Sequence, residues 1–223
     1  MENFRIYEEK FEGTNGTFSN KLYQYDKNGF LIKTIEKGSE EKIFYDDGFK
    51  KSIIENFEEE TQYLYDMQGY LFKTESNRDN KLVSYKMFYY YDRFICDYSG
   101  KKKPTKVEFY ISRKVTSGNG VKIEYFLHRY FNCIYYDDFL IKIIDYKFFG
   151  EIDQMLINQE FIIQYDDKNN RVRTLRANFD VVSSRAYDKN GLLMEINLTK
   201  GGKVTFSWEK GNTNYEYDMY LIC

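Results

Sequence analysis

The sequence predicts an all-β protein: an antiparallel meander of about eight or more β-hairpin repeats that forms a curled sheet or a barrel- or sandwich-like array. One observation is a turn motif that recurs along the chain. The other is the composition, with 19% aromatic residues, 23 Tyr, 19 Phe and a single Pro. Aromatic side chains pack well on pleated surfaces, and a backbone almost free of Pro can donate its ladder hydrogen bonds.

The repeat unit is clearest in residues 22–32, where strand-forming residues flank Asp26, Asn28 and Gly29. Asp and Asn bond to nearby backbone and Gly accepts positive φ, so this segment predicts a tight reversal between two strands. The Tyr-Asp pair that opens the turn occurs at Tyr25-Asp26, Tyr45-Asp46, Tyr65-Asp66, Tyr91-Asp92, Tyr136-Asp137, Tyr165-Asp166, Tyr187-Asp188 and Tyr217-Asp218. Recurrence of one motif along a chain indicates a repeat architecture. The predicted structural turn residues are Asp26, Gly29, Gly48, Asp66, Gly69, Asp188 and Gly191.

The repeats predict a single domain over residues 1–223. Residues 1–22 are expected to form an N-terminal cap hairpin, with its tip at Gly13 to Gly16. Residues 85–150 form a divergent middle with longer loops, where large apolar groups occupy both faces of the strands. A strand with two apolar faces must be covered twice, so the sheet is expected to curl over here or to meet a partner. Residues 150–164 predict a short helix or loop.

The pattern Tyr-Asp-x-x-Gly followed by an aliphatic strand resembles the YD-repeat, or Rhs-like, β-hairpin repeat family. The resemblance covers roughly residues 22–220, with gaps. In that family the hairpins add side by side into a long coiled sheet, which wraps a toxic cargo domain in large members. This chain departs from the pattern, because Phe30, Phe49, Tyr70 and Leu192 replace the Arg that commonly follows the Gly. The resemblance implies a hairpin-repeat sheet and a place in a polymorphic toxin system.

No set of residues predicts catalysis, a cofactor or a metal site. His128 and Cys133 are five residues apart, which in an extended strand places them on opposite faces. Pairs such as Asp46-Asp47 and Asp166-Asp167 lack the twelve-residue calcium loop with its terminal Glu. A protein with one histidine and three cysteines, which lack metal-type spacing, also gives little basis for zinc.

Charge and targeting signals predict a cytoplasmic protein that does not enter a membrane. The first ten residues contain no apolar leader segment, 30% of the residues are charged, and no apolar run approaches the length of a spanning helix. Residues 1–66 carry 15 acidic and 9 basic side chains, whereas residues 67–150 carry 9 and 15. These counts predict an acidic end and a basic middle. The formal net charge of −2 argues against nucleic acid as the partner.

From these features we expect a non-enzymatic, protein-binding repeat protein, specifically a cytoplasmic immunity protein that neutralises a cognate toxin domain by direct binding. Tyr is favoured at interfaces because it offers a large contact area with a polar tip. The expected partner-binding residues are Glu36, Glu40, Glu41, Glu58, Glu59, Glu60, Tyr89, Tyr90 and Tyr135. The alternatives are a polysaccharide- or nucleic-acid-binding module, with Lys101, Lys102 and Lys103 among aromatic residues, or a structural repeat protein.

Overall fold

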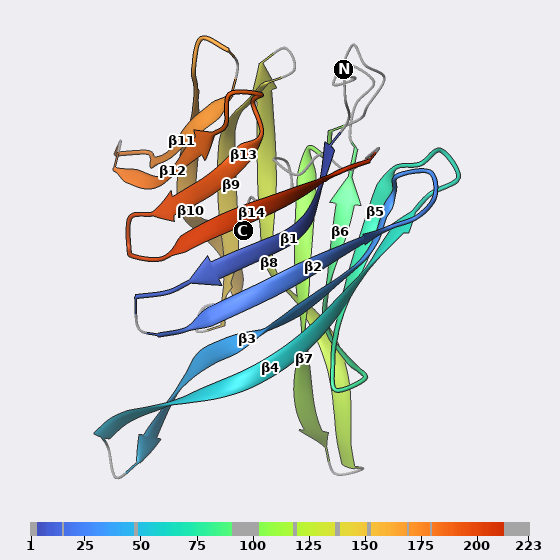
Figure 1. Cartoon of the computed structure of the whole chain (residues 1–223). Helices are drawn as coiled ribbons and strands as arrows, with labels where there is room; N and C mark the ends of the chain where they lie inside the picture. The colour runs from blue at the N-terminus through green and yellow to red at the C-terminus, as the bar shows by residue number, and fades with distance from the viewer. Residues whose placement is uncertain are drawn as a thin grey trace. The chain divides into compact units, whose positions relative to one another are not determined.

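The structure is a computed structural model that describes residues 4–14, 16–46, 49–90, 103–117, 120–136, 139–150, 153–168, 170–178 and 180–211 (Figure 1). Side chains are described for these residues except 43–46, 49–51, 117 and 120. The described residues form fourteen strands: β1 (Phe4–Glu12), β2 (Phe18–Tyr25), β3 (Leu31–Asp46), β4 (Phe49–Tyr65), β5 (Leu71–Arg78), β6 (Lys81–Tyr89), β7 (Lys106–Ser117), β8 (Gly120–Tyr136), β9 (Phe139–Phe149), β10 (Gln154–Tyr165), β11 (Arg171–Arg176), β12 (Val181–Tyr187), β13 (Leu193–Leu198) and β14 (Lys203–Lys210).

The strands follow one another as an antiparallel meander that closes into a barrel. Each strand neighbours the next one in the sequence, and β1 also pairs with β14, from Phe4 opposite Lys210 to Glu12 opposite Lys203. The predicted all-β antiparallel meander is therefore confirmed, and it closes as a barrel. The hairpin of β1 and β2 does not end the sheet, because β1 has a partner on both sides.

The turns repeat one hydrogen-bond pattern. In the turn after β2, Oδ1 of Asp26 accepts bonds from the backbone N–H groups of Asn28 (2.8 Å) and Phe30 (2.9 Å). Asp66, Asp166 and Asp188 accept the same two bonds at their own turns. Gly29, Gly69 and Gly191 have φ of 85°, 81° and 82°, a conformation that is strained for residues with a side chain. Gly48 lies outside the described residues.

Tyrosine hydroxyls fasten hairpins to the strands before them. Tyr25 donates to the carbonyl of Ile6 (2.8 Å), and Tyr165 donates to the carbonyl of Leu140 (3.1 Å). In both cases the Tyr directly precedes the turn Asp, so at these two sites the Tyr-Asp pair has two structural roles. The Asp closes the turn, and the Tyr bonds a main-chain oxygen of an earlier hairpin.

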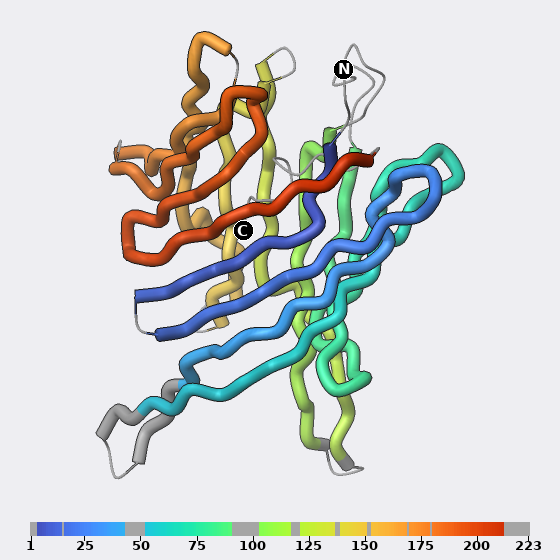
Figure 2. Tube along the Cα trace, in the orientation of Figure 1, coloured from blue at the N-terminus to red at the C-terminus, as the bar shows by residue number. Residues whose placement is uncertain are grey.

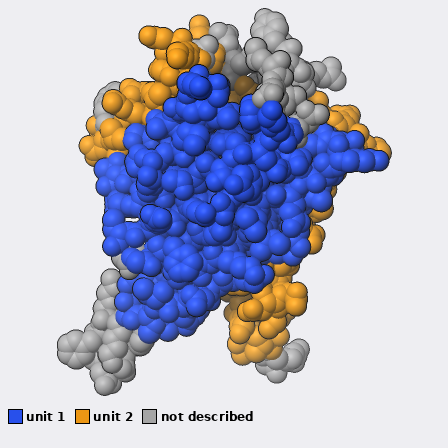
Figure 3. Space-filling view, in the orientation of Figure 1, with its two compact units in different colours: residues 1–61, 182–215 blue, residues 62–181, 216–223 orange. Residues whose placement is uncertain are grey.

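The chain divides into two compact units, which Figure 3 shows in different colours. Unit 1 comprises residues 1–61 and 182–215. Its core contains Ile6, Tyr23, Leu31, Ile196 and Phe206, all of which are buried. Alternate positions carry cross-strand ion pairs such as the one between Lys203 and Glu195. The single-domain organisation stays a prediction.

Unit 2 comprises residues 62–181 and 216–223 and contains the divergent middle of the chain. One face of its sheet carries the buried cluster of Leu71, Phe88, Val107, Phe131, Cys133, Leu140, Ile143 and Ile163. The opposite face carries stacked tyrosine pairs and ion pairs. Tyr85 stacks on Tyr110 with ring centroids 4.6 Å apart, and Tyr130 stacks on Tyr146 at 4.4 Å.

The predicted helix or loop at residues 150–164 is wrong over its described part, because residues 154–165 form strand β10. β10 pairs with β9 on one side and with β11 on the other. The register shifts between Ile157 and Gln159, so Asn158 is an extra residue in the ladder. Such a bulge interrupts the period of two that identifies a strand, which explains why the segment resembled a helical face.

Candidate functional site

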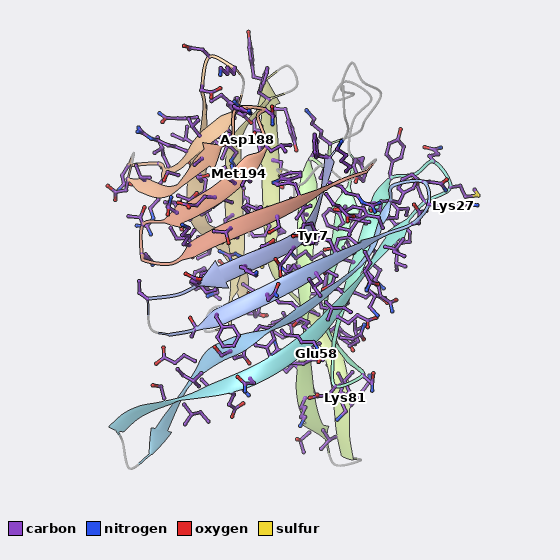
Figure 4. The ribbon with its side chains drawn as sticks, in the orientation of Figure 1. Tyr7, Lys27, Glu58, Lys81, Asp188 and Met194 are labelled. Carbon is purple, nitrogen blue, oxygen red and sulfur yellow. The ribbon has the colours of Figure 1, made fainter. Side chains whose placement is uncertain are left out.

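The acidic residues expected to bind a partner are engaged within unit 1. Glu36 pairs with Lys21 (3.0 Å), Glu58 pairs with Lys37 (2.9 Å) and Glu60 pairs with Lys33 (2.5 Å). Figure 4 labels Glu58 on β4. Glu40, Glu41 and Glu59 also take part in interactions within the chain. Cross-strand lysines therefore neutralise much of the acidic segment.

The three tyrosines expected at an interface have structural partners in unit 2. Tyr90 donates to the carbonyl of Leu71 (2.8 Å), and Tyr135 donates to the carbonyl of Pro104 (3.0 Å). Both rings also pack against the buried cluster. The hydroxyl of Tyr89 donates to Glu108 (2.6 Å). The hydrogen bonds that hold these hydroxyls were not visible in the sequence, because each acceptor lies 19 or more residues away.

Glu108 is the centre of a hydrogen-bonded group on the face opposite the core. It accepts bonds from Tyr89, Tyr110 and Lys106. Burial alone would raise the pKa of Glu108, but these three bonds together hold it below its usual value. Burial and the adjacent carboxylate raise the pKa of Tyr110 to about 12. The group is an ionised carboxylate with its donors in place, which stabilises the sheet locally.

The hairpin of β7 and β8 extends beyond the strands beside it (Figure 2). β6 pairs with β7 only as far as Ile111, and β9 pairs with β8 only from Arg129 onward. In the described pairings, residues 112–117 pair only with residues 120–125 of the other strand. We call residues 112–117 and 120–125 the β7–β8 extension. Among the described strands, no other strand pairs with it, so it is a two-stranded ribbon.

One face of the β7–β8 extension carries three exposed apolar side chains. Val121, Ile123 and Tyr125 have exposed fractions of 65%, 49% and 37%, and their spacing of two places them on one face. In the described part of the chain, no other strand has three successive same-face positions that are all apolar and exposed. The exposed pairs Ile53–Ile54 and Leu156–Ile157 are consecutive residues, so their members point to opposite faces.

The same extension carries three cations and one carboxylate. Lys114 stands directly opposite Ile123 and therefore shares the apolar face. Arg113 stacks over the ring of Phe126 (5.2 Å), and Lys122 pairs with Glu124 (3.3 Å). Lys114 and Arg113 form no ion pair with any described residue. The ribbon thus combines an exposed apolar column with a net positive charge.

His128 lies where the β7–β8 ladder is irregular. The register shifts between Phe109 and Tyr110, which face Arg129 and Leu127, so His128 is the bulged residue. Its ring meets those of Phe109 and Phe126 at centroid distances of 6.2 Å. Phe109 pairs with Arg129, and Arg129 shares a face with Cys133. Because the bulged His128 contacts Phe109, the prediction that His128 and Cys133 lie on opposite faces is wrong. Cys133 is buried as a free thiol, while Cys96 and Cys223 lie outside the described residues.

The described ranges contain neither a metal-binding cluster nor a membrane-spanning helix. There, no group of three or more His, Cys, Asp or Glu side chains could hold a metal ion. No helix among the described residues is long and apolar enough to cross a membrane.

Comparison with known proteins gives a likeness in fold. No family model matches the chain, and no curated protein sequence matches it. Among solved structures, the fold aligns with a porin-like protein from Bacteroides uniformis, with 9% sequence identity and a TM-score of 0.41. The alignment covers 92% of this chain and 98% of that one. Values this low establish neither membership of a family nor an activity.

These findings correct the expectations that came from the resemblance to the YD-repeat family. That resemblance is wrong, because no family model matches and the fourteen strands of the described residues close into a barrel. The predictions of a cytoplasmic immunity protein, of its alternatives as a polysaccharide-binding, nucleic-acid-binding or structural repeat protein, of a toxin partner and of a cytoplasmic location without membrane contact are corrected with it. Lys101 and Lys102, the centre of the basic segment, lie outside the described residues.

Proposed function

We propose that this protein is a non-enzymatic barrel that attaches peripherally to anionic lipid surfaces through the β7–β8 extension. The observation that carries the proposal is the exposed column of Val121, Ile123 and Tyr125 on a ribbon that also bears Arg113, Lys114 and Lys122. Lys114 shares the face of the column, and Arg113 and Lys122 lie on the other face of the ribbon. An apolar face combined with basic residues is the composition of segments that lie in the membrane interface.

The shape of the extension favours contact with a lipid surface over contact with a protein partner. A stable protein interface buries about 800 Å² on each partner, which is far more than three side chains on a narrow ribbon provide. A lipid surface needs no matching pocket, because the side chains insert between headgroups. Tyr suits this boundary, since its ring is apolar and its hydroxyl can stay hydrated.

Energetics predict weak and reversible attachment. Each fully buried aliphatic side chain contributes about 1.5–3 kcal/mol, and these three insert only in part. Each basic residue close to an anionic surface contributes about 1 kcal/mol, from which Glu124 subtracts. Because the basic residues act through screened charge, the attachment weakens as salt rises.

The charges on the sheet of unit 2 favour attachment at the membrane surface over insertion of the sheet into the membrane. The face opposite its core carries the ion pairs Lys73–Glu75, Lys106–Glu108 and Lys142–Glu160. Barrels that span membranes turn an apolar band outward, and a lysine there costs about 2–4 kcal/mol at the midplane. The lipid contact is therefore assigned to the extension alone.

Flotation with vesicles tests the proposal. The parent protein should float with vesicles that contain one third phosphatidylglycerol in phosphatidylcholine, and much less with phosphatidylcholine alone. The double variant Val121→Ser with Ile123→Ser should stay at the bottom of the gradient. Ile157→Ser, which removes an isoleucine of similar exposure (54%) from β10 of the same unit, should float like the parent. Equal flotation of all three proteins would overturn the assignment to the extension.

A further inference from the structure

A row of cations crosses the sheet of unit 2 on the face that carries the core. The register pairs Lys86 with Phe109, Phe109 with Arg129, and Arg129 with Lys147, on strands β6 to β9. Directly paired residues share a face, and neighbouring strands lie about 4.8 Å apart. Three positive side chains and one aromatic ring therefore form a single line across four strands, which we call the cation row.

The charge of the cation row is only partly neutralised by the protein. Arg129 makes two bonds to Asp145, from Nε (2.6 Å) and Nη2 (2.7 Å), and Asp145 is fully buried. Asn158 also donates to Asp145, so the acceptor capacity of that carboxylate is already in use. Among the described residues, no carboxylate forms an ion pair with Lys86 or Lys147.

This lack of a carboxylate contrasts with three lysines on the opposite face of the sheet. Lys73, Lys106 and Lys142 each have a glutamate partner on the opposite face of the same unit. On the core face, Lys147 instead stands directly across from Arg129, and like charges in that position destabilise a sheet. An arrangement that costs stability in this way is expected where a ligand completes it.

Aromatic rings surround the row. Lys86 lies over Phe109 (5.8 Å), and His128 meets both Phe109 and Phe126 edge to face. Phe126 also meets Phe148 at 6.3 Å. Lys86, Lys147 and the rings of Phe109 and Phe126 are each partly exposed.

We propose that the cation row binds a small organic anion, a phosphate monoester on an aromatic body, with the phosphate between Arg129 and Lys147 and the ring against Phe109 and Phe126. The phosphate would supply the counter-charge that Lys147 lacks. The ring would add to apolar side chains that already line the face. The proposal is independent of lipid attachment, since the apolar column of the extension lies on the other face of the sheet.

The single histidine of the chain reports on this site. Burial lowers the pKa of His128, and Lys147 and Arg129 lower it further, whereas Asp145 raises it. A bound anion would offset the two cations and raise the pKa of His128. Because the protein has one histidine, its ring signals in a proton NMR spectrum need no assignment by mutation.

The experiment is a titration of the full chain with phenyl phosphate, followed through the His128 ring signals. We expect a saturable shift, a raised pKa of His128, and weaker effects from inorganic phosphate. Neutral benzyl alcohol should leave the signals in place. Lys147→Gln should weaken binding about fivefold to tenfold, the effect of losing one charge-assisted contact at a half-exposed site. Lys86→Gln should weaken it less, because Lys86 lies two strands from Arg129.

The matched control is Lys142→Gln, which removes a lysine from the same strand on the opposite face. It should bind phenyl phosphate like the parent. The variant with Val121→Ser and Ile123→Ser should also bind normally, even where it no longer floats with vesicles. A linear, unsaturated shift, an equal response to benzyl alcohol, or an equal loss in Lys142→Gln would overturn the proposal.

Discussion

The hydroxyl of Tyr125 donates a hydrogen bond to the main-chain carbonyl of Leu82 at 3.1 Å. Tyr125 is the innermost residue of the apolar column on the β7–β8 extension, and Leu82 lies in β6, whose described pairing with β7 ends at Ile111. The ring of Tyr125 also meets Tyr85 at 5.6 Å. These contacts hold the base of the extension against the sheet while leaving Val121 and Ile123 exposed.

Removing that hydroxyl should separate the structural role of the Tyr125 hydrogen bond from the role of the Tyr125 ring in lipid contact. Tyr125→Phe loses one exposed hydrogen bond, so the free energy of unfolding should fall by less than about 1 kcal/mol. Flotation with anionic vesicles should persist, because the ring remains. Tyr125→Ser should float less than Tyr125→Phe. Equal flotation of the two variants would remove Tyr125 from the proposed lipid contact.

The ion pair of the partly exposed Arg129 with the fully buried Asp145 should contribute more to the stability of unit 2 than the exposed ion pairs do. Asp145→Ala leaves Arg129 beside Lys147 without its carboxylate and leaves Asn158 without its acceptor. Because the side chain of Arg129 is partly exposed, the cost should be about 2–3 kcal/mol, below the figure for a fully buried pair. Glu160→Ala, which breaks a half-exposed pair with Lys142, should cost at most about 1 kcal/mol. Urea denaturation midpoints measure the difference. Similar midpoints for the two variants would contradict this prediction.

The turn glycines should be required for their backbone conformation. No atom lies within 4 Å of a Cβ built on Gly191, whose φ is +82°, so a side chain there meets strain without a clash. Gly191→Val should destabilise the protein by about 1–3 kcal/mol. Gly191→Asn should cost less, because Asn tolerates positive φ. Thermal unfolding compares the two, and a larger loss for Asn than for Val would refute the explanation.

His128 predicts a pH dependence of stability. Its pKa is lowered from 6.5 by burial and by the nearby cations, so the unfolded chain binds a proton more readily than the folded one. The contribution of His128 to the free energy of unfolding is therefore fully present above about pH 6.5 and falls as the pH decreases below that value. His128→Gln should lose this part of the dependence between pH 6.5 and the range where carboxylates titrate. Unfolding midpoints at pH 7.5 and 5.5 test it, and identical pH profiles would contradict it.

Local chemistry made the repeated turns predictable from the sequence. Asp26, Asp66 and Asp188 accept the backbone bonds that Asp favours at a turn, and the glycines behind them adopt positive φ. Alternation of apolar residues in aromatic-rich runs likewise predicted the strands. These signals lie within a few residues of one another, so they can be recognised in a single sequence.

Long-range pairings and bulges could not be predicted in the same way. Closure of the barrel joins β1 to β14, nearly 200 residues apart, and no local pattern encodes that pairing. Bulges at His128 and Asn158 reverse the side-chain alternation. They led to the wrong prediction of a short helix or loop at residues 150–164 and to the wrong faces for His128 and Cys133. The ion pairs that neutralise Glu58 and Glu60 also depend on strand neighbours.

The most direct test of peripheral attachment measures which residue enters the lipid. Ile123→Trp places a reporter on the extension, and Ile157→Trp places one at a similarly exposed position on β10, each read against the parent with its single tryptophan. With anionic vesicles that contain lipids brominated high on the acyl chain, the added fluorescence of Ile123→Trp should be quenched, and that of Ile157→Trp should not. Quenching at residue 157 alone, or at neither position, would contradict attachment through the β7–β8 extension.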